Sequence, residues 1–187
     1  MVLGLKRGTI RLEPHCHEWP RLFAQEECAI RAALGHLVLD VQHIGSTAVP
    51  GLLAKPILDI GVAVRHSADV GPCVAPLAAL GYQFLGDRRC AGDWFFAKGS
   101  DDLCTHYVHM VEHTSSAWAN YLAFRDALAT DERVRTEYAS LKLRLAVESG
   151  GSRDAYATGK DQFVRGVAAR RLGAAQEGSE PPTGPHP

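Results

Sequence analysis

Two short segments in the first third of the chain constrain its fold most. The first, His43 to Gly51, reads HIGSTAVPG, and the second, Lys55 to Ile60, reads KPILDI. A β-type run over residues 37–44 ends in the Gly–Ser turn, and a second over 56–64 carries one carboxylate, Asp59, among apolar residues. Glycine lets the backbone approach an anion, serine adds a hydroxyl group, and an acid fixed on a strand can hold a metal ion. This order of elements is typical of a phosphate-handling site.

Length and composition predict one globular domain. The chain has 187 residues, of which 46% are hydrophobic and 22% charged, so it is long enough to bury its own core. A net charge of −1 gives no general attraction to nucleic acid or to an anionic membrane, and neither is expected as a partner. We expect a single domain over residues 1–172 and a disordered tail over 173–187, which is rich in proline, glycine and serine.

The sequence also predicts the compartment. No apolar run reaches the roughly 18 to 20 residues that span a bilayer, and residues 1–11 lack the apolar stretch of a signal peptide. The five cysteines are odd in number and widely spaced, without a Cys-x-x-Cys pair, which argues against a disulfide framework and a thiolate zinc site. A cytoplasmic location is therefore expected, and the oligomeric state is left open.

Hydrophobic periodicity and turn residues predict the order of the elements. The pattern favours an N-terminal mixed sheet covered by helices and a helical C-terminal segment, with the last two strands forming a hairpin. The expected helices cover residues 20–34, 72–80, 116–129, 131–147 and 153–172, and the expected strands cover residues 37–44, 56–64, 82–85, 94–98 and 103–112.

The longer string HIGSTAVPGLLAKPILDI resembles the GrpB family, a branch of the nucleotidyltransferase superfamily whose members are sometimes fused to dephospho-coenzyme A kinase. The resemblance covers residues 10 to 170 and implies an α+β, nucleotidyltransferase-like fold with a small mixed sheet. Further matching segments follow in the order expected of the family: Leu12–Pro14, Glu18–Phe23, Thr105–His109, Trp118 with Phe124–Asp126, Tyr138 with Leu141–Lys142, and Tyr156 with Gly159–Lys160 and Phe163.

The same resemblance implies an enzyme that transfers a nucleotidyl group from a nucleoside triphosphate to a small acceptor, with a divalent cation, Mg²⁺ or Mn²⁺, as cofactor. Asp59 would hold the cation, and His109 or His43 would act as the base, with His109 also a possible metal ligand. The residues implied for phosphate binding are Gly45, Ser46, Thr47, Lys55, Arg125, Lys142 and Lys160.

Two departures from the family pattern leave other functions open. Members of the superfamily usually carry a second acid two residues after the first, where this chain has Gly61, and often a third acid on a neighbouring strand, where it has His109. One carboxylate and one imidazole suit a single transition-metal ion better than they suit a pair of Mg²⁺ ions. A nucleotide-binding module without transfer activity, an accessory protein and a metal-assisted hydrolase therefore remain alternatives. Residues that could supply a missing acid are Asp93, Asp101 and Asp102.

Strand and helix periodicity sort the remaining candidates. His106 and His109 are three residues apart on one expected strand, so they point to opposite faces and cannot share one ion. The helix after Ser116 places Arg125 among apolar residues, where it either pairs with an internal carboxylate or binds a phosphate.

Overall fold

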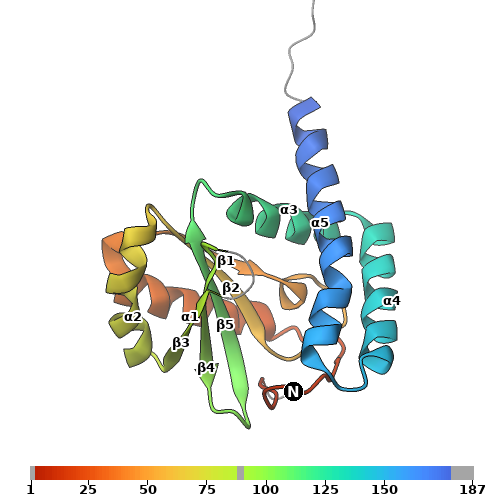
Figure 1. Cartoon of the computed structure of the whole chain (residues 1–187), viewed down its shortest axis with the longest axis horizontal. Helices are drawn as coiled ribbons and strands as arrows, with labels where there is room; N and C mark the ends of the chain where they lie inside the picture. Colours follow the sequence, from red (N-terminus) through yellow and green to blue (C-terminus); the bar gives the residue numbers. More distant parts are fainter. Residues whose placement is uncertain (1–2, 88–90, 178–187) are drawn as a thin grey trace, which may run out of the picture.

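The computed structural model describes residues 3–87 and 91–177 of the chain. These residues form a five-stranded sheet with the order β1-β2-β5-β4-β3 and helices on both faces (Figure 1). The strands are β1 (Val38–Ile44), β2 (Leu58–Val64), β3 (Tyr82–Asp87), β4 (Trp94–Gly99) and β5 (Cys104–Glu112). The helices are α1 (Trp19–Leu34), α2 (Val70–Ala79), α3 (Ser116–Thr130), α4 (Glu132–Glu148) and α5 (Arg153–Glu177), with single 3₁₀ turns η1 (Gly35–Leu37), η2 (Ser46–Ala48) and η3 (Ser67–Asp69).

The sheet is mixed because β5 runs parallel to β2 and antiparallel to β4. In the β2–β5 pair Asp59 lies beside Tyr107, and Gly61 lies beside His109. Ile44, the last residue of β1, pairs with Asp59 across the antiparallel β1–β2 ladder. The turn that follows β1 therefore begins next to the Asp59 carboxylate, and the predicted hairpin of the last two strands is confirmed.

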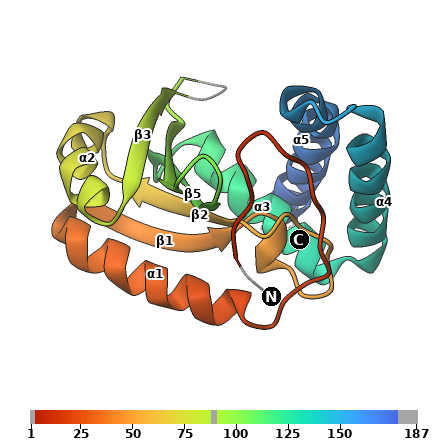
Figure 2. The same ribbon diagram turned by 90° about the horizontal axis from the view of Figure 1, so that it is seen from below.

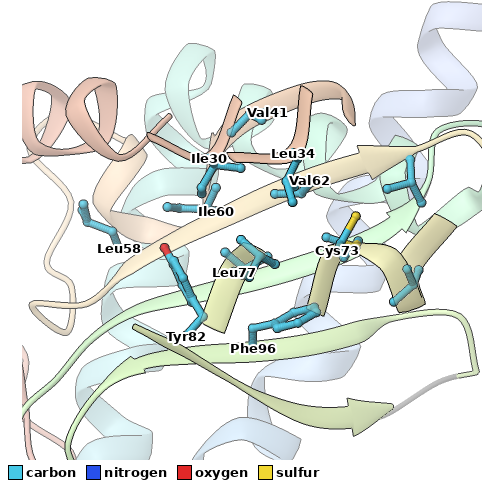
Figure 3. Close-up of a cluster of buried hydrophobic side chains, with 14 of the residues drawn as sticks. Ile30, Leu34, Val41, Leu58, Ile60, Val62, Cys73, Leu77, Tyr82 and Phe96 are labelled. Atoms are coloured by element: carbon cyan, nitrogen blue, oxygen red, sulfur yellow. The ribbon is translucent and has the colours of Figure 1, made fainter. Parts of the chain in front are cut away.

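One face of the sheet packs against α1 and α2 and carries the main core (Figure 3). Alternation along β2 sends its even-numbered side chains to this face, as the sequence predicts. Pro20 occupies the first turn of α1, and Gly35 follows its end with a φ of +55°, a conformation that glycine adopts without strain. The core contributed by these elements includes Ile30, Leu34, Leu58, Ile60, Val62, Cys73, Leu77, Phe96, Val108 and Met110.

The opposite face of the sheet meets the C-terminal helices. Trp118 of α3 packs on Ala63 of β2 and Val111 of β5, and α3, α4 and α5 lie together at one end of the sheet (Figure 2). A second core between these helices reaches the segment that joins β1 to β2 through Val49 and Leu52. Its helical members include Phe124, Leu128, Tyr138, Val167 and Ala168.

A partly buried ion pair joins α1 to β4. Nζ of Lys98 on β4 lies 2.7 Å and 2.8 Å from the two carboxylate oxygens of Glu26 on α1, which is only 9% exposed. The His106 ring lies 3.9 Å from the same carboxylate on the α1 face of the sheet. Burial lowers the pKa of His106 to about 4 despite the attraction of Glu26, so this imidazole is neutral in the folded protein near pH 7.

The expected elements are all found, with differences of up to five residues at their ends. β3 continues to Asp87, and α5 continues to Glu177 instead of ending at residue 172. The helix extends because Ala174 and Ala175 are strong helix formers that outweigh the weak propensity of Gly173, and its last turns project beyond the other helices (Figure 1). The rest of the expected tail, 178–187, lies outside the described residues.

Two further expectations bear on class and compartment. None of the helices in the described ranges combines the length and apolarity that crossing a membrane requires. The four cysteines that the structure describes, Cys16, Cys28, Cys73 and Cys104, carry free thiols, and Cys90 lies outside the described residues.

Candidate functional site

The turn after β1 is shaped by the close approach of Gly45 to Asp59. Gly45 has a φ of +72°, which side chains rarely tolerate. A Cβ at Gly45 would lie 2.6 Å from Oδ2 and 2.9 Å from Cβ of Asp59, well inside van der Waals contact. Glycine is therefore required here both by the backbone conformation and by the neighbouring carboxylate.

Asp59 is a partly exposed acid on the face of β2 that looks toward the C-terminal helices. Among residues 3–87 and 91–177, no side chain or backbone N–H forms a hydrogen bond or ion pair with its carboxylate. Its charge nevertheless acts on its surroundings, because it raises the pKa values of Tyr138, Tyr156 and Lys142 after the larger effect of burial on each. Asp59 thus lies within electrostatic reach of α4 and α5.

Lys142 of α4 fixes the segment between β1 and β2. The residue is 1% exposed, and its ammonium donates to Oγ of Ser46 at 3.2 Å and to the backbone carbonyl of Leu53. It also lies 4.7 Å from the centre of the Tyr138 ring. Burial and repulsion from Lys160 lower the pKa of Lys142 to about 7, which Asp59 opposes in part.

Two more lysines meet at the ring of Tyr156, a buried residue of α5. Nζ of Lys55, just before β2, lies 4.6 Å from the ring centre, and Nζ of Lys160, one turn along α5, lies 4.5 Å from it. Cations are attracted to the face of an aromatic ring, so Tyr156 brings together charges that repel one another. With Lys142 they form a group of three lysines near Asp59, which we call the lysine group.

Thr47 and His43 support the turn from the other side. His43 pairs with Ile60 in the β1–β2 ladder, so it shares the α1 face of the sheet and points away from Asp59. Its Nε2 lies 3.0 Å from Oγ1 of the buried Thr47, and its ring stacks on Phe23 at 4.6 Å. Burial, followed by the charges of Arg125 and His15, lowers the pKa of His43 to about 4. These contacts suit a neutral imidazole that holds the turn.

Arg125 of α3 forms hydrogen bonds and an ion pair with other residues of the protein. Its guanidinium pairs with the adjacent Asp126 at 2.7 Å and donates to Oε1 of Gln42 at 2.8 Å and to the carbonyl of His43 at 3.4 Å. The carboxylate partner, Asp126, is 46% exposed, so it differs from the internal carboxylate raised by the sequence, and phosphate binding by Arg125 stays a prediction. The pair is partly exposed and links α3 to β1.

Position 61 leaves little room for a side chain. A Cβ at Gly61 would lie 3.0 Å from Cζ3 of Trp118 and 3.3 Å from Cγ2 of Ile44. Within the described ranges, no group of three or more histidine, cysteine, aspartate or glutamate side chains is arranged to hold a metal ion. The donors therefore do not fit a pair of carboxylate-clamped cations, whereas the Asp59 carboxylate alone suits one hard cation that binds a ligand's oxygens as well.

His109 on β5 lies on the same face of the sheet as Asp59, offset from it by two residues. It belongs to a polar cluster with Asp93 and Tyr121. Nδ1 of His109 lies 3.2 Å and 3.3 Å from the two oxygens of Asp93, which is 5% exposed. The hydroxyl of Tyr121 donates to Oδ2 of Asp93 at 2.6 Å and lies 3.1 Å from Nδ1. The predicted separation of His106 from His109 onto opposite faces is confirmed.

The predicted residues thus fall into two sets. Gly45, Ser46, Lys55, Asp59, Lys142 and Lys160 surround one place between the sheet and the C-terminal helices, and His109 lies on the same face of the sheet. Thr47, His43 and Arg125 make internal contacts that hold β1 and its turn. Sequence reasoning missed Tyr156 and Tyr121 as members of these clusters and considered Asp93 only as a spare acid. A tyrosine four residues before Lys160 on one helix was the available signal for Tyr156.

These features define an α+β protein with one mixed sheet and a lysine-rich site where the sheet meets its C-terminal helices. The chain belongs to the GrpB protein family, whose model matches residues 9–170. It is 37% identical over 167 residues to the glutamate-rich protein GrpB of Alkalihalophilus pseudofirmus, covering 87% of this chain and 96% of that protein. The crystal structure of the conserved protein GrpB from Enterococcus faecalis is similar with a TM-score of 0.80 and 30% identity, covering 89% of this chain and 99% of that one.

A more distant likeness involves the Cid1 poly(U) polymerase in its MgGTP-bound form. The TM-score is 0.46 at 16% identity, covering 65% of this chain and 41% of that one. A likeness of this extent carries no argument about function.

Proposed function

We propose that this protein binds a nucleoside triphosphate at the Gly45–Ser46 turn and transfers its nucleotidyl group to a small acceptor, with one divalent cation held at Asp59. The observation that carries the proposal is the lysine group beside a carboxylate that has no hydrogen-bond or ion-pair partner in the described ranges. A polyphosphate chain would pair with the ammonium groups of the lysine group, and a bound cation would pair with Asp59.

The roles of the residues follow from their contacts. Lys142 donates hydrogen bonds to Ser46 and to the carbonyl of Leu53 and so fixes the turn. Lys55 and Lys160 lie over the ring of Tyr156. We assign Lys55 and Lys160 to the phosphates and Lys142 to the positioning of the turn. A cation at Asp59 would neutralise phosphate charge and orient the reacting phosphorus.

A thermal-shift screen tests the binding step. The four common nucleoside triphosphates are added to the wild type with and without Mg²⁺ or Mn²⁺, and then to Asp59→Asn. We expect a stabilisation that needs the metal and is lost in Asp59→Asn, because a ligand that binds only the folded state raises its melting temperature. Asp101→Asn, which alters an exposed carboxylate paired with Arg7, should keep the full shift. A wild type that no nucleotide stabilises would contradict the proposal.

A second candidate function is nucleotide binding without transfer. It is favoured by Trp118, whose ring fills the space beside Gly61 in which a second acid would lie. The two functions differ in one measurement, the release of pyrophosphate from the bound nucleotide. Stabilisation by a nucleotide with metal, without pyrophosphate release to any of a panel of hydroxyl-bearing acceptors, would favour the binding module.

A further inference from the structure

The cluster of Asp93, His109 and Tyr121 fixes the protonation of an imidazole. A carboxylate can only accept hydrogen bonds, so the ring nitrogen that faces Asp93, Nδ1, must carry the proton. In the neutral ring Nε2 then carries the lone pair, and Nε2 forms no hydrogen bond within the described ranges. The Tyr121 hydroxyl donates to the same carboxylate and so holds Asp93 in place.

The surroundings of the ring keep it rigid but reachable. His109 packs against Phe95 with ring centres 5.0 Å apart and against Tyr121 at 5.3 Å. Its side chain is 17% exposed, whereas that of Asp93 is 7% exposed. The carboxylate partner is thus buried, and the His109 side chain is partly accessible.

The cluster also lies on the right face of the sheet. Asp59 and His109 both point toward the C-terminal helices, on neighbouring parallel strands and offset by two residues. Strand geometry puts their Cα atoms about 8 Å apart. This separation is within the span of a small molecule that contacts both residues.

We propose that His109 is the base that activates a hydroxyl-bearing acceptor, with Asp93 and Tyr121 as its positioning residues; this inference rests on the proposed function. The acceptor's hydroxyl proton moves to Nε2, and the acceptor oxygen forms a bond to the α-phosphorus. The bond from that phosphorus to the bridging oxygen breaks, and its electron pair leaves with pyrophosphate. Asp93 stabilises the imidazolium that results.

Chemical labelling tests the geometry without knowledge of the acceptor. Diethyl pyrocarbonate modifies accessible neutral imidazoles, and peptide mapping gives the rate at each histidine. We expect His109 to react in the wild type and to be protected several-fold by MgATP, while the exposed His17 and His113 react equally with and without it. A His109 that resists the reagent, or that MgATP does not protect although it stabilises the protein, would overturn the inference.

Ring spectroscopy separates positioning from simple support of the fold. Proton–nitrogen correlation spectra of the wild type should show His109 protonated at Nδ1, and Asp93→Asn should shift the tautomer toward Nε2–H. Tyr121→Phe removes one hydrogen bond to Asp93. It should leave the His109 tautomer unchanged and slow catalysis, though by less than Asp93→Asn does. An unchanged tautomer in Asp93→Asn would contradict the role given to that carboxylate.

Pyrophosphate release from ATP, with excess glycerol as the hydroxyl probe, tests the base itself. His109→Gln should lower the rate at least 100-fold and leave the MgATP-induced thermal shift unchanged, and added imidazole should restore part of the rate in His109→Ala. If MgATP does not raise the melting temperature of the wild type, the proposed function itself is refuted. A normal shift with equal rates in wild type and His109→Gln would refute only the inference about His109.

Discussion

Cζ3 of Trp118 lies 3.0 Å from the point that a Cβ at Gly61 would occupy. The indole covers the place on β2 that lies two residues from Asp59 and beside His109. The contact explains why a glycine stands in the interior of a central strand, where it would otherwise be unfavourable.

The first prediction concerns this contact. Gly61→Ala should lower the free energy of unfolding by about 1 to 3 kcal/mol, because an added methyl group in a packed core forces its neighbours to move. Urea denaturation measures the change. In the Trp118→Leu background the same substitution should cost much less. Gly71→Ala is the matched control, since Gly71 lies in α2 with open space around it, and it should be neutral or stabilising by up to about 1 kcal/mol.

The second prediction separates backbone strain from contact with Asp59. Gly51 has a φ of +76° and open space around it, so Gly51→Ala should cost only the strain, about 1 to 2 kcal/mol. Gly45 has a similar φ, but its ψ of −169° is nearly exclusive to glycine and an added Cβ meets the Asp59 carboxylate. Gly45→Ala should therefore cost more and abolish metal-dependent nucleotide binding. Denaturation and thermal shift measure the two effects. Equal losses of stability at both positions would mean that the Asp59 contact relaxes freely.

The third prediction concerns the pH dependence caused by Lys142. Its pKa falls from 10.5 to about 7 on folding, so between these values the unfolded state binds more protons than the folded state. The wild type should therefore gain stability as the pH rises from about 7 toward about 10. Lys142→Met removes this gain, and the difference between the two proteins measured by denaturation should grow with pH. Lys6→Met, at an exposed lysine, should leave the slope unchanged.

The fourth prediction concerns acid. His43 and His106 both have a pKa lowered to about 4 by burial, so each binds a proton more readily in the unfolded state between pH 4 and 6.5. Their contribution is complete above about pH 6.5 and is lost as the pH falls toward 4. His106→Gln should flatten the loss of stability over this range in denaturation measurements. His113→Gln, at an exposed ring, should not; an equal flattening would argue against burial as the cause.

Much of the fold could be predicted because its signals are local. Alternation along β2 separated Asp59 and Gly61 from Leu58 and Ile60, and the glycines at 35 and 81 marked the ends of helices. The predicted end of α5 at residue 172 is wrong, because Gly173 indicates a break that the helix passes through. Propensity alone decides such a case poorly.

The site could be predicted only in part, because its assembly depends on strand order. The sequence placed Asp59 beside the Gly–Ser turn, but it did not give the parallel pairing of β2 with β5 that puts His109 on the same face. Arg125 lies on an apolar helix face, which fits both a ligand contact and an internal pair. Its ion pair with Asp126 and its hydrogen bond to Gln42 are seen only in the three-dimensional structure.

The shared ring of Tyr156 has a consequence for folding. Lys55 and Lys160 are more than a hundred residues apart in sequence, yet they lie over this one ring. Contacts of such long range form late, because the intervening chain must be ordered first. We therefore expect the lysine group to assemble late in folding, and slowed hydrogen exchange in α5 on adding a polyphosphate would report that the ligand ties α5 to the segment before β2.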